Sequence, residues 1–186
     1  DLQRRRLDPY VFAFNAAMSA CEKRRQPDRA WALLREMQLR EIAPNTMSYN
    51  AVISACAAVG EWRPALDLLV ELKERLLVPS LITFNALISA CDTGRSWRWA
   101  VELYAQVLEE QLEPDANTCN GVLSACERGQ RWAQVLELLH RMEHVDITAQ
   151  EVAVRAYEVG LQWRPLPRLL LSDAQQAGIS ACRDYF

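Results

Sequence analysis

Four asparagines stand out in this sequence because they offer the same chemistry at a fixed interval. They are 35 residues apart, and each has a serine four residues later: Asn15 with Ser19, Asn50 with Ser54, Asn85 with Ser89, and Asn120 with Ser124. On a helix this spacing places the amide and the hydroxyl on one face. A neutral amide offers both donors and an acceptor, which suits the Watson–Crick edge of a base. One such asparagine would more simply cap or bridge helices, but four in phase could line a groove that reads bases.

The elements that must position these asparagines repeat at the same interval. Cysteines and prolines keep the 35-residue step: Cys21, Cys56, Cys91 and Cys126, and Pro9, Pro44, Pro79 and Pro114. Within each unit, apolar residues recur at i, i+3, i+4 and i+7, as on one face of an α-helix. One unit has the stripes Tyr49, Val52, Ile53, Cys56 and Ala65, Leu68, Leu69, Leu72. Its two halves, like those of its neighbours, are separated by a proline or a glycine: Pro27, Gly60, Gly94 and Gly129. Each unit is therefore expected to be a pair of helices.

One helix pair cannot bury its apolar stripes alone, so neighbouring pairs must stack. We therefore predict an all-α fold, a right-handed α-solenoid of 35-residue helix-turn-helix repeats whose first helices line one surface. The expected units are 1–10 as the end of a preceding repeat, 11–45, 46–80 and 81–115 as full repeats, 116–146 as a short repeat, and 147–186 as a degenerate repeat. The fourth unit is short because "SACERGQRW" reappears as "RAYEVGLQW" only 31 residues later.

The repeat resembles that of the pentatricopeptide repeat family. The resemblance rests on the 35-residue step, an aromatic residue before the asparagine, and segments such as "LISAC" and "ALDLL", and it covers nearly the whole chain. Tetratricopeptide repeats have a step of about 34 residues and a Trp-Leu-Gly-Tyr pattern that this chain lacks. The resemblance implies modular binding of single-stranded RNA, one base per repeat, in mitochondria or chloroplasts.

The resemblance also gives each asparagine a partner, the last residue before the next first helix. These partners are Asn45, Ser80, Asp115 and, allowing for the short repeat, Asp146. We expect them in solvent-facing loops. In the family, Asn followed by Asp favours uracil, Asn followed by Ser favours cytosine, and Asn followed by Asn favours either pyrimidine. The implied site from 5′ to 3′ is therefore pyrimidine, cytosine, uracil, uracil, and its last base depends on where the short repeat is aligned.

Two further contacts with RNA follow from the resemblance. Side chains that sandwich a base are expected two residues after each partner position, at Phe12, Met47 and Ile82, although Asn117 breaks the series. Inter-repeat packing is the alternative role of these apolar residues. Phosphate contacts are expected near the end of the first helices, at Lys23 and Arg128, where the other two units have Ala58 and Thr93.

The net charge of the chain argues against nucleic-acid binding. The formal net charge is −3 at pH 7, whereas nucleic-acid binders are usually basic. The main alternative function is therefore a helical-repeat scaffold whose groove binds a protein or a peptide, and a structural spacer is the second. The asparagine series favours RNA, because a peptide groove does not need one identical amide in every repeat.

The remaining polar residues suggest neither catalysis nor a cofactor. A 35-residue cysteine spacing matches no zinc arrangement, and His140 and His144 lack a third ligand, so no metal site is predicted. The cysteines are interpreted as small buried hydrophobes of an intracellular or organellar protein. The in-phase residues Trp62, Trp97 and Trp132 are interpreted as packing residues at the start of second helices. We expect a non-enzyme without cofactor or small-molecule substrate.

The ends of the chain and its hydropathy bear on its location. No apolar run reaches the roughly 18 residues that a membrane span needs, so no membrane association is predicted. The chain opens on Asp1 in mid-pattern, and we therefore expect a fragment of a longer protein whose targeting segment lies outside it.

Overall fold

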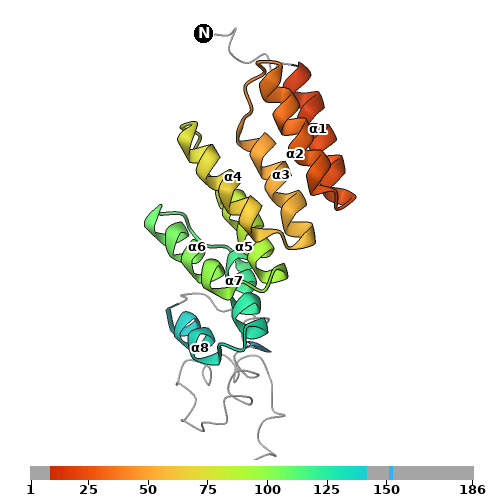
Figure 1. The fold of residues 1–186 in the computed structure, drawn as a ribbon. Coiled ribbons are helices and arrows are strands. Elements are labelled where there is room, and N and C mark those ends of the chain that lie inside the picture. The colour runs from red at the N-terminus through yellow and green to blue at the C-terminus, as the bar shows by residue number, and fades with distance from the viewer. Residues whose placement is uncertain (1–8, 142–150, 153–186) are drawn as a thin grey trace, which may run out of the picture.

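The computed structural model describes residues 9–141 and 151–152 of the chain. In this part it contains eight named α-helices and no strand (Figure 1). They are α1 (Pro9–Lys23), α2 (Pro27–Leu39), α3 (Thr46–Val59), α4 (Trp62–Glu74), α5 (Leu81–Thr93), α6 (Trp97–Glu109), α7 (Ala116–Arg128) and α8 (Trp132–Arg141). The helices α3, α5 and α7 begin at a 35-residue step, as expected, and α1 begins two residues ahead of the expected boundary at residue 11. The predicted end of the fourth repeat, residues 142–146, lies outside the described residues. The fifth repeat, 147–186, also lies outside them except for residues 151–152.

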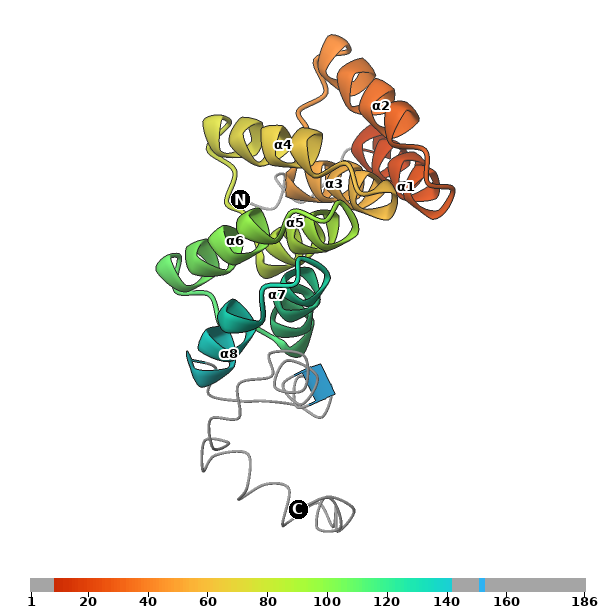
Figure 2. The same cartoon turned by 60° about the horizontal axis from the view of Figure 1, so that its bottom comes forward.

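The helices form two layers (Figure 2). The first helices of the hairpins, α1, α3, α5 and α7, stack directly on one another, and the contacts between successive members of this series are the most extensive in the described chain. The second helices cover the other side, and α2, α4 and α6 also contact the first helix of the next hairpin. The prediction of an all-α solenoid of helix-turn-helix units is confirmed, and its first helices form one continuous layer.

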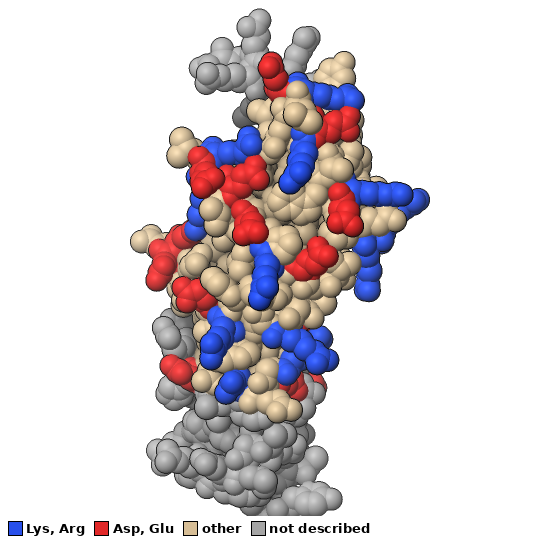
Figure 3. Space-filling model, in the orientation of Figure 1, with Lys and Arg blue, Asp and Glu red and all other residues tan. Residues whose placement is uncertain are grey.

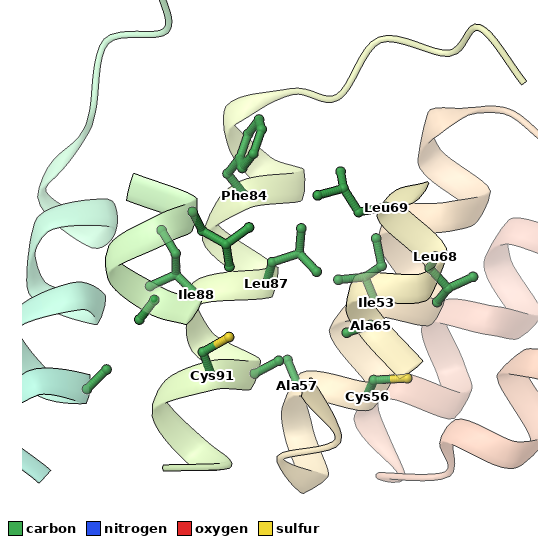
Figure 4. Close-up of a cluster of buried hydrophobic side chains, with 14 of the residues drawn as sticks. Ile53, Cys56, Ala57, Ala65, Leu68, Leu69, Phe84, Leu87, Ile88 and Cys91 are labelled. Atoms are coloured by element: carbon green, nitrogen blue, oxygen red, sulfur yellow. The ribbon is translucent and has the colours of Figure 1, made fainter. Parts of the chain in front are cut away.

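The core is shared between neighbouring hairpins. Figure 4 shows Ile53 of α3 beside Leu87 of α5, which belongs to the next hairpin. Both side chains are fully buried. Because each hairpin completes the core of its neighbour, a change in one repeat should affect the stability of the adjacent repeats.

The cysteines at the repeat interval belong to this core. Cys56, Cys91 and Cys126 are buried, while Cys21 is half-buried. Burial raises the pKa of the Cys56 thiol to about 11 and the pKa of the Cys91 thiol to about 12. These thiols therefore stay protonated at neutral pH and act as small hydrophobic side chains, as the sequence predicts.

Tryptophans at the start of second helices pack on glycines of the next hairpin. A Cβ atom on Gly94 would lie 2.4 Å from Cδ1 of Trp62, and one on Gly129 would lie 2.7 Å from Cδ1 of Trp97. Neither glycine has a positive φ, so the close approach of the indole ring, not the backbone conformation, requires glycine here. Gly60 differs, because its φ of 81° lies in the left-handed region. The expectation that these tryptophans are packing residues is confirmed for Trp62 and Trp97.

The Gly94→Ala substitution tests this packing. We expect it to lower the free energy of unfolding by about 1 to 3 kcal/mol, because the added methyl group would overpack a site closed by a tryptophan ring and a backbone carbonyl. Ser89→Ala, at an exposed position of the same helix α5, is the control, with an expected change within about 0.5 kcal/mol. Urea unfolding followed by circular dichroism measures both, and equal stability of the two variants would contradict the proposed contact.

Candidate functional site

Three equivalent polar clusters lie between successive first helices. In each, a hydroxyl group on the third residue of a first helix donates a hydrogen bond to the asparagine Oδ1 of the preceding first helix. The bonds run from Ser48 to Asn15 at 2.7 Å, from Thr83 to Asn50 at 2.7 Å, and from Thr118 to Asn85 at 2.6 Å. The three hydroxyl residues are 0% exposed, whereas the three asparagines are half-buried. The asparagines therefore tie neighbouring repeats together while one side of each remains accessible.

The partner positions cap the first helices. Asn45, Ser80 and Asp115 are the N-cap residues of α3, α5 and α7, and each forms a capping box with the buried hydroxyl residue of its own helix. In each box the cap side chain accepts from the backbone N–H of the hydroxyl residue, and the hydroxyl oxygen accepts from the cap N–H. The expectation that these residues lie in solvent-facing loops is incomplete, because each side chain also accepts a hydrogen bond from a backbone N–H at the start of a helix.

The structure brings the predicted pairs together in three units. Nδ2 of Asn15 lies 3.3 Å from Oδ1 of Asn45. Nδ2 of Asn85 lies 3.1 and 3.3 Å from the two carboxylate oxygens of Asp115. In the unit between them, Thr83 links Asn50 to the cap Ser80. The partner of the fourth pair, Asp146, lies outside the described residues, and the pairing of Asn120 with it stays a prediction.

The sequence reasoning missed the buried hydroxyls. Ser48, Thr83 and Thr118 are 35 residues apart, in phase with the asparagines, and each stands three residues after its cap. A serine or threonine three residues after an Asn, Ser or Asp that opens a helix is the spacing of a capping interaction. That periodic signal would have identified these residues as part of the same cluster.

Exposed apolar side chains accompany the pairs. Phe12, Met47 and Ile82 are 69%, 67% and 67% exposed. Met47 and Ile82 stand two residues after the caps Asn45 and Ser80. Exposure of two thirds disfavours inter-repeat packing as their role. Large apolar side chains that remain exposed at a regular step instead indicate a surface prepared for a ligand.

The layer of first helices has an open groove next to these pairs. It is lined by residues of α1, α3 and α5 and by the turn after α1, including Glu22, Arg25, Ser54 and Ser89. Ser54 and Ser89 are the serines that follow Asn50 and Asn85 by four residues, but neither asparagine is among the residues that line this groove. The lining also includes Ala57, Ala58 and Ala86, so it is mixed, and it carries charges of both signs.

The first helices carry few of the charges of the described chain. α3 has no charged residue and α5 has only Asp92. Most charged residues lie on the second helices and the turns, and Figure 3 shows the two signs interspersed on the face in view. The net negative charge is therefore not concentrated on the layer that carries the asparagines.

The two edges of the solenoid nevertheless differ in charge. Basic residues outnumber acidic ones at the ends where first helices turn into second helices: Lys23, Arg24, Arg25, Arg29, Arg63, Arg95, Arg98, Arg128 and Arg131, against Glu22, Asp28, Glu61, Asp92 and Glu127. Acidic residues dominate the opposite edge: Glu36, Glu41, Glu71, Glu74, Glu109, Glu110, Glu113 and Asp115, against Arg35, Arg40, Lys73 and Arg75. Of the two residues predicted to contact phosphate, Lys23 is exposed, and Arg128 is ion-paired through Nε to Oδ1 of Asp92 at 3.2 Å. Both lie on the basic edge.

Asp115 has an altered pKa. Partial burial acts to raise the pKa, but hydrogen bonds from the backbone N–H and hydroxyl of Thr118 and from the amides of Asn85 and Asn117 outweigh it, so that the pKa of the carboxyl lies below its ordinary value. The group is therefore ionised at neutral pH and acts only as a hydrogen-bond acceptor.

The described residues include neither a metal-binding cluster nor a membrane-spanning helix. Among them, no group of three or more His, Cys, Asp and Glu side chains is placed to hold a metal ion. None of the described helices is long and apolar enough to cross a membrane.

The repeats match known protein families. The family model described as "Pentatricopeptide repeat domain" matches residues 32–93, and the model described as "PPR repeat" matches residues 12–42. No curated protein matches the chain.

Two solved structures are similar to the fold. One is the PPR domain of Arabidopsis thaliana protein-only RNase P 1 (PRORP1) in complex with tRNA, with a TM-score of 0.68, 15% identity, and 84% of each chain covered. The other is the maize pentatricopeptide repeat protein PPR10 in complex with an 18-nt psaJ RNA element, with a TM-score of 0.65 and 24% identity. That match covers 90% of this chain and 25% of PPR10, so the chain spans about a quarter of that relative. At these identities the likeness concerns the fold alone.

The depressed pKa of Asp115 predicts a pH effect on stability. Because the pKa is lower in the folded state, the contribution of Asp115 to stability is complete above its unfolded pKa of about 3.9 and is lost as pH falls through the folded value. Asp115→Asn keeps a capping side chain and resembles the Asn15–Asn45 pair, but it cannot titrate. We expect the melting temperature of the wild type to fall further between pH 6 and pH 3 than that of Asp115→Asn. Equal falls would show that the hydrogen bonds to this carboxylate do not favour its ionised form.

Proposed function

The chain contains pentatricopeptide repeats, and we propose from this premise that it binds single-stranded RNA along its layer of first helices, one base per repeat. The observation that carries the proposal is a half-buried amide with a polar cap beside it, found at a fixed step in three units, and an exposed apolar side chain two residues after the cap in two of them, Met47 and Ile82. A base has hydrogen-bonding edges and flat apolar faces, and this combination complements both.

The base that we propose for each repeat follows from the hydrogen-bond donors and acceptors of its cap residue. Ionised Asp115 can only accept, so it suits the N3–H donor of uracil and would repel the N3 acceptor of cytosine. The hydroxyl of Ser80 can donate to N3 of cytosine. Asn45 carries both kinds of group and suits either pyrimidine. With Asp146 as the fourth partner, the proposed site from 5′ to 3′ is pyrimidine, cytosine, uracil, uracil.

The charge distribution supports a defined placement of the strand. The asparagine–cap pairs lie toward the acidic edge, where second helices lead into first helices, and Lys23 and Arg128 lie at the basic edge. A strand in the groove with its bases toward the caps would direct its phosphates toward the basic edge. Because Arg128 already pairs with Asp92, we propose that its contribution to phosphate binding is partial.

The proposed role is binding without catalysis, in the RNA metabolism of a mitochondrion or chloroplast. Amides and hydroxyls, which dominate the clusters, are suited to recognition rather than to activating a water or a nucleophile. The two similar structures are complexes of pentatricopeptide repeat proteins with RNA, which supports RNA as the class of partner. The compartment rests on the family resemblance.

Binding to short RNA should be weak and selective for pyrimidines. Four units that each contribute about 1 to 2 kcal/mol before ordering costs correspond to affinities between millimolar and micromolar. Fluorescence anisotropy at low salt, with a labelled RNA that carries the proposed site and a matched purine RNA, measures this. If neither RNA binds at high micromolar protein concentration, the proposal fails, and the alternative function, a scaffold whose groove binds a peptide, is favoured.

The proposed relation between the cap residue and the base predicts the effect of one substitution. Ser80→Asp should change the preference of the second unit from cytosine to uracil, because the cap then accepts and no longer donates. The fold should survive, since aspartate is as good an N-cap as serine. The expected discrimination is about five- to a hundred-fold between RNAs that differ at this base.

A matched control exists in the same chain. Ser96 is the N-cap of α6 and makes no side-chain capping bond, so Ser96→Asp adds the same charge on a second helix, away from the asparagine–cap pairs. It should leave the preference for cytosine unchanged. If Ser80→Asp and the wild type bind RNA but do not distinguish the two bases, Asn50 and Ser80 do not read bases.

A further inference from the structure

We propose that Ser48, Thr83 and Thr118 are positioning residues that set the base preference of the asparagines before them. Each buried hydroxyl holds the carbonyl of its asparagine inward, so that the amide NH2 group is the part presented to the base. The inference rests on the proposed function, since it concerns how the same clusters select a base. In the cluster of Asn50 the cap Ser80 can donate or accept, so the cap alone does not require this orientation.

The hydrogen bonds around Thr83 show how the orientation is set. Its hydroxyl oxygen accepts from the backbone N–H of Ser80 at 3.0 Å, so its own proton must go to another acceptor. Two are in reach, Oδ1 of Asn50 at 2.7 Å and Oγ of Ser80 at 3.2 Å. The shorter distance favours Asn50, and Oγ of Ser80 already accepts from the backbone N–H of Thr83. The asparagine carbonyl is therefore held toward the buried hydroxyl.

The other two clusters give the same orientation for an additional reason. A reversed Asn85 amide would turn its carbonyl oxygen toward the ionised carboxylate of Asp115, which the NH2 group now contacts at 3.1 Å. Two acceptors facing each other would repel. In the first cluster Nδ2 of Asn15 contacts Oδ1 of Asn45 at 3.3 Å, and reversal would again bring two oxygens together.

Burial makes the arrangement rigid. The three hydroxyl residues are fully buried, so water does not compete for their protons. The same donor is then presented at every reading position, and it suits the O2 carbonyl that uracil and cytosine share and adenine lacks. An outward carbonyl would instead favour adenine, which offers an exocyclic amine and no carbonyl oxygen. The hydroxyl series therefore confers a common preference for pyrimidines over adenine, and the cap makes the choice between cytosine and uracil.

The test compares Thr83→Val, which keeps the shape and removes the hydroxyl, with Thr83→Ser, which keeps the hydroxyl. Affinities of the whole chain are measured for two RNAs that differ only in cytosine or adenine at the second position, because the hydroxyl is proposed to set the pyrimidine preference and the cap to choose between cytosine and uracil. The wild type and Thr83→Ser should prefer cytosine by about five- to a hundred-fold, and Thr83→Val should show less than about twofold preference. Discrimination at the third position, read by Asn85 and Asp115, should remain in Thr83→Val.

A purely structural role of Thr83 predicts a different result. Loss of a capping bond alone would lower melting temperature and weaken binding to both RNAs equally, leaving their ratio unchanged, and that outcome overturns the inference. Ser48→Ala, with Ser48→Thr as its control, gives a second case if Thr83→Val does not fold, measured as the pyrimidine-to-adenine ratio at the first position. A wild type that binds no RNA refutes the proposed function itself, and the positioning role with it. A wild type that discriminates alongside an equally discriminating Thr83→Val refutes the positioning role alone.

Discussion

Each hairpin in this chain leaves apolar surface that only the next hairpin covers. Ile53 of one repeat is fully buried, next to Leu87 of the following repeat. The stacking distance must therefore be nearly constant from repeat to repeat, and any group at the same position in each repeat recurs along the surface at the same spacing. A periodic row of amides is a consequence of burying a periodic core. A ligand with its own regular repeat, such as a single strand of RNA, is the natural complement of such a row.

A second constraint acts on the residues proposed to choose the base. Asn45, Ser80 and Asp115 are helix N-caps, a position where Asn, Ser and Asp are among the best residues. The same three residue types differ in their donors and acceptors. Variation at this position can therefore change hydrogen-bonding preference without removing the cap. Restriction to these residue types follows from helix capping alone, so only base discrimination separates a reading role from a structural one.

The helix pairs and the core could be predicted from the sequence because both depend on periodicity. The buried hydroxyls were in phase as well, but a serine or threonine inside a helix has no single role until its neighbours are known. The glycines show the limit most clearly: Gly60, Gly94 and Gly129 all mark the break between helices, yet only Gly60 has a positive φ. The equivalent left-handed positions in the other repeats are Arg25, Arg95 and Gln130. These residue types seldom adopt that conformation, so the sequence does not indicate it at these positions. Contacts between repeats, such as Gly94 with Trp62, depend on three-dimensional packing and could not be read from one repeat.

The net charge illustrates how a property of the whole chain can differ from that of its surface. A value of −3 argues against nucleic acid only if the charges are evenly spread. Here α3 has no charge, and basic residues outnumber acidic ones at one edge of the solenoid while acidic residues outnumber basic ones at the other. A strand that lies across a neutral layer with phosphates at the basic edge meets a local field that the total does not describe. Since few of these basic residues lie in the groove itself, recognition must depend mainly on hydrogen bonds and stacking, and its affinity should depend less on salt than that of a basic protein.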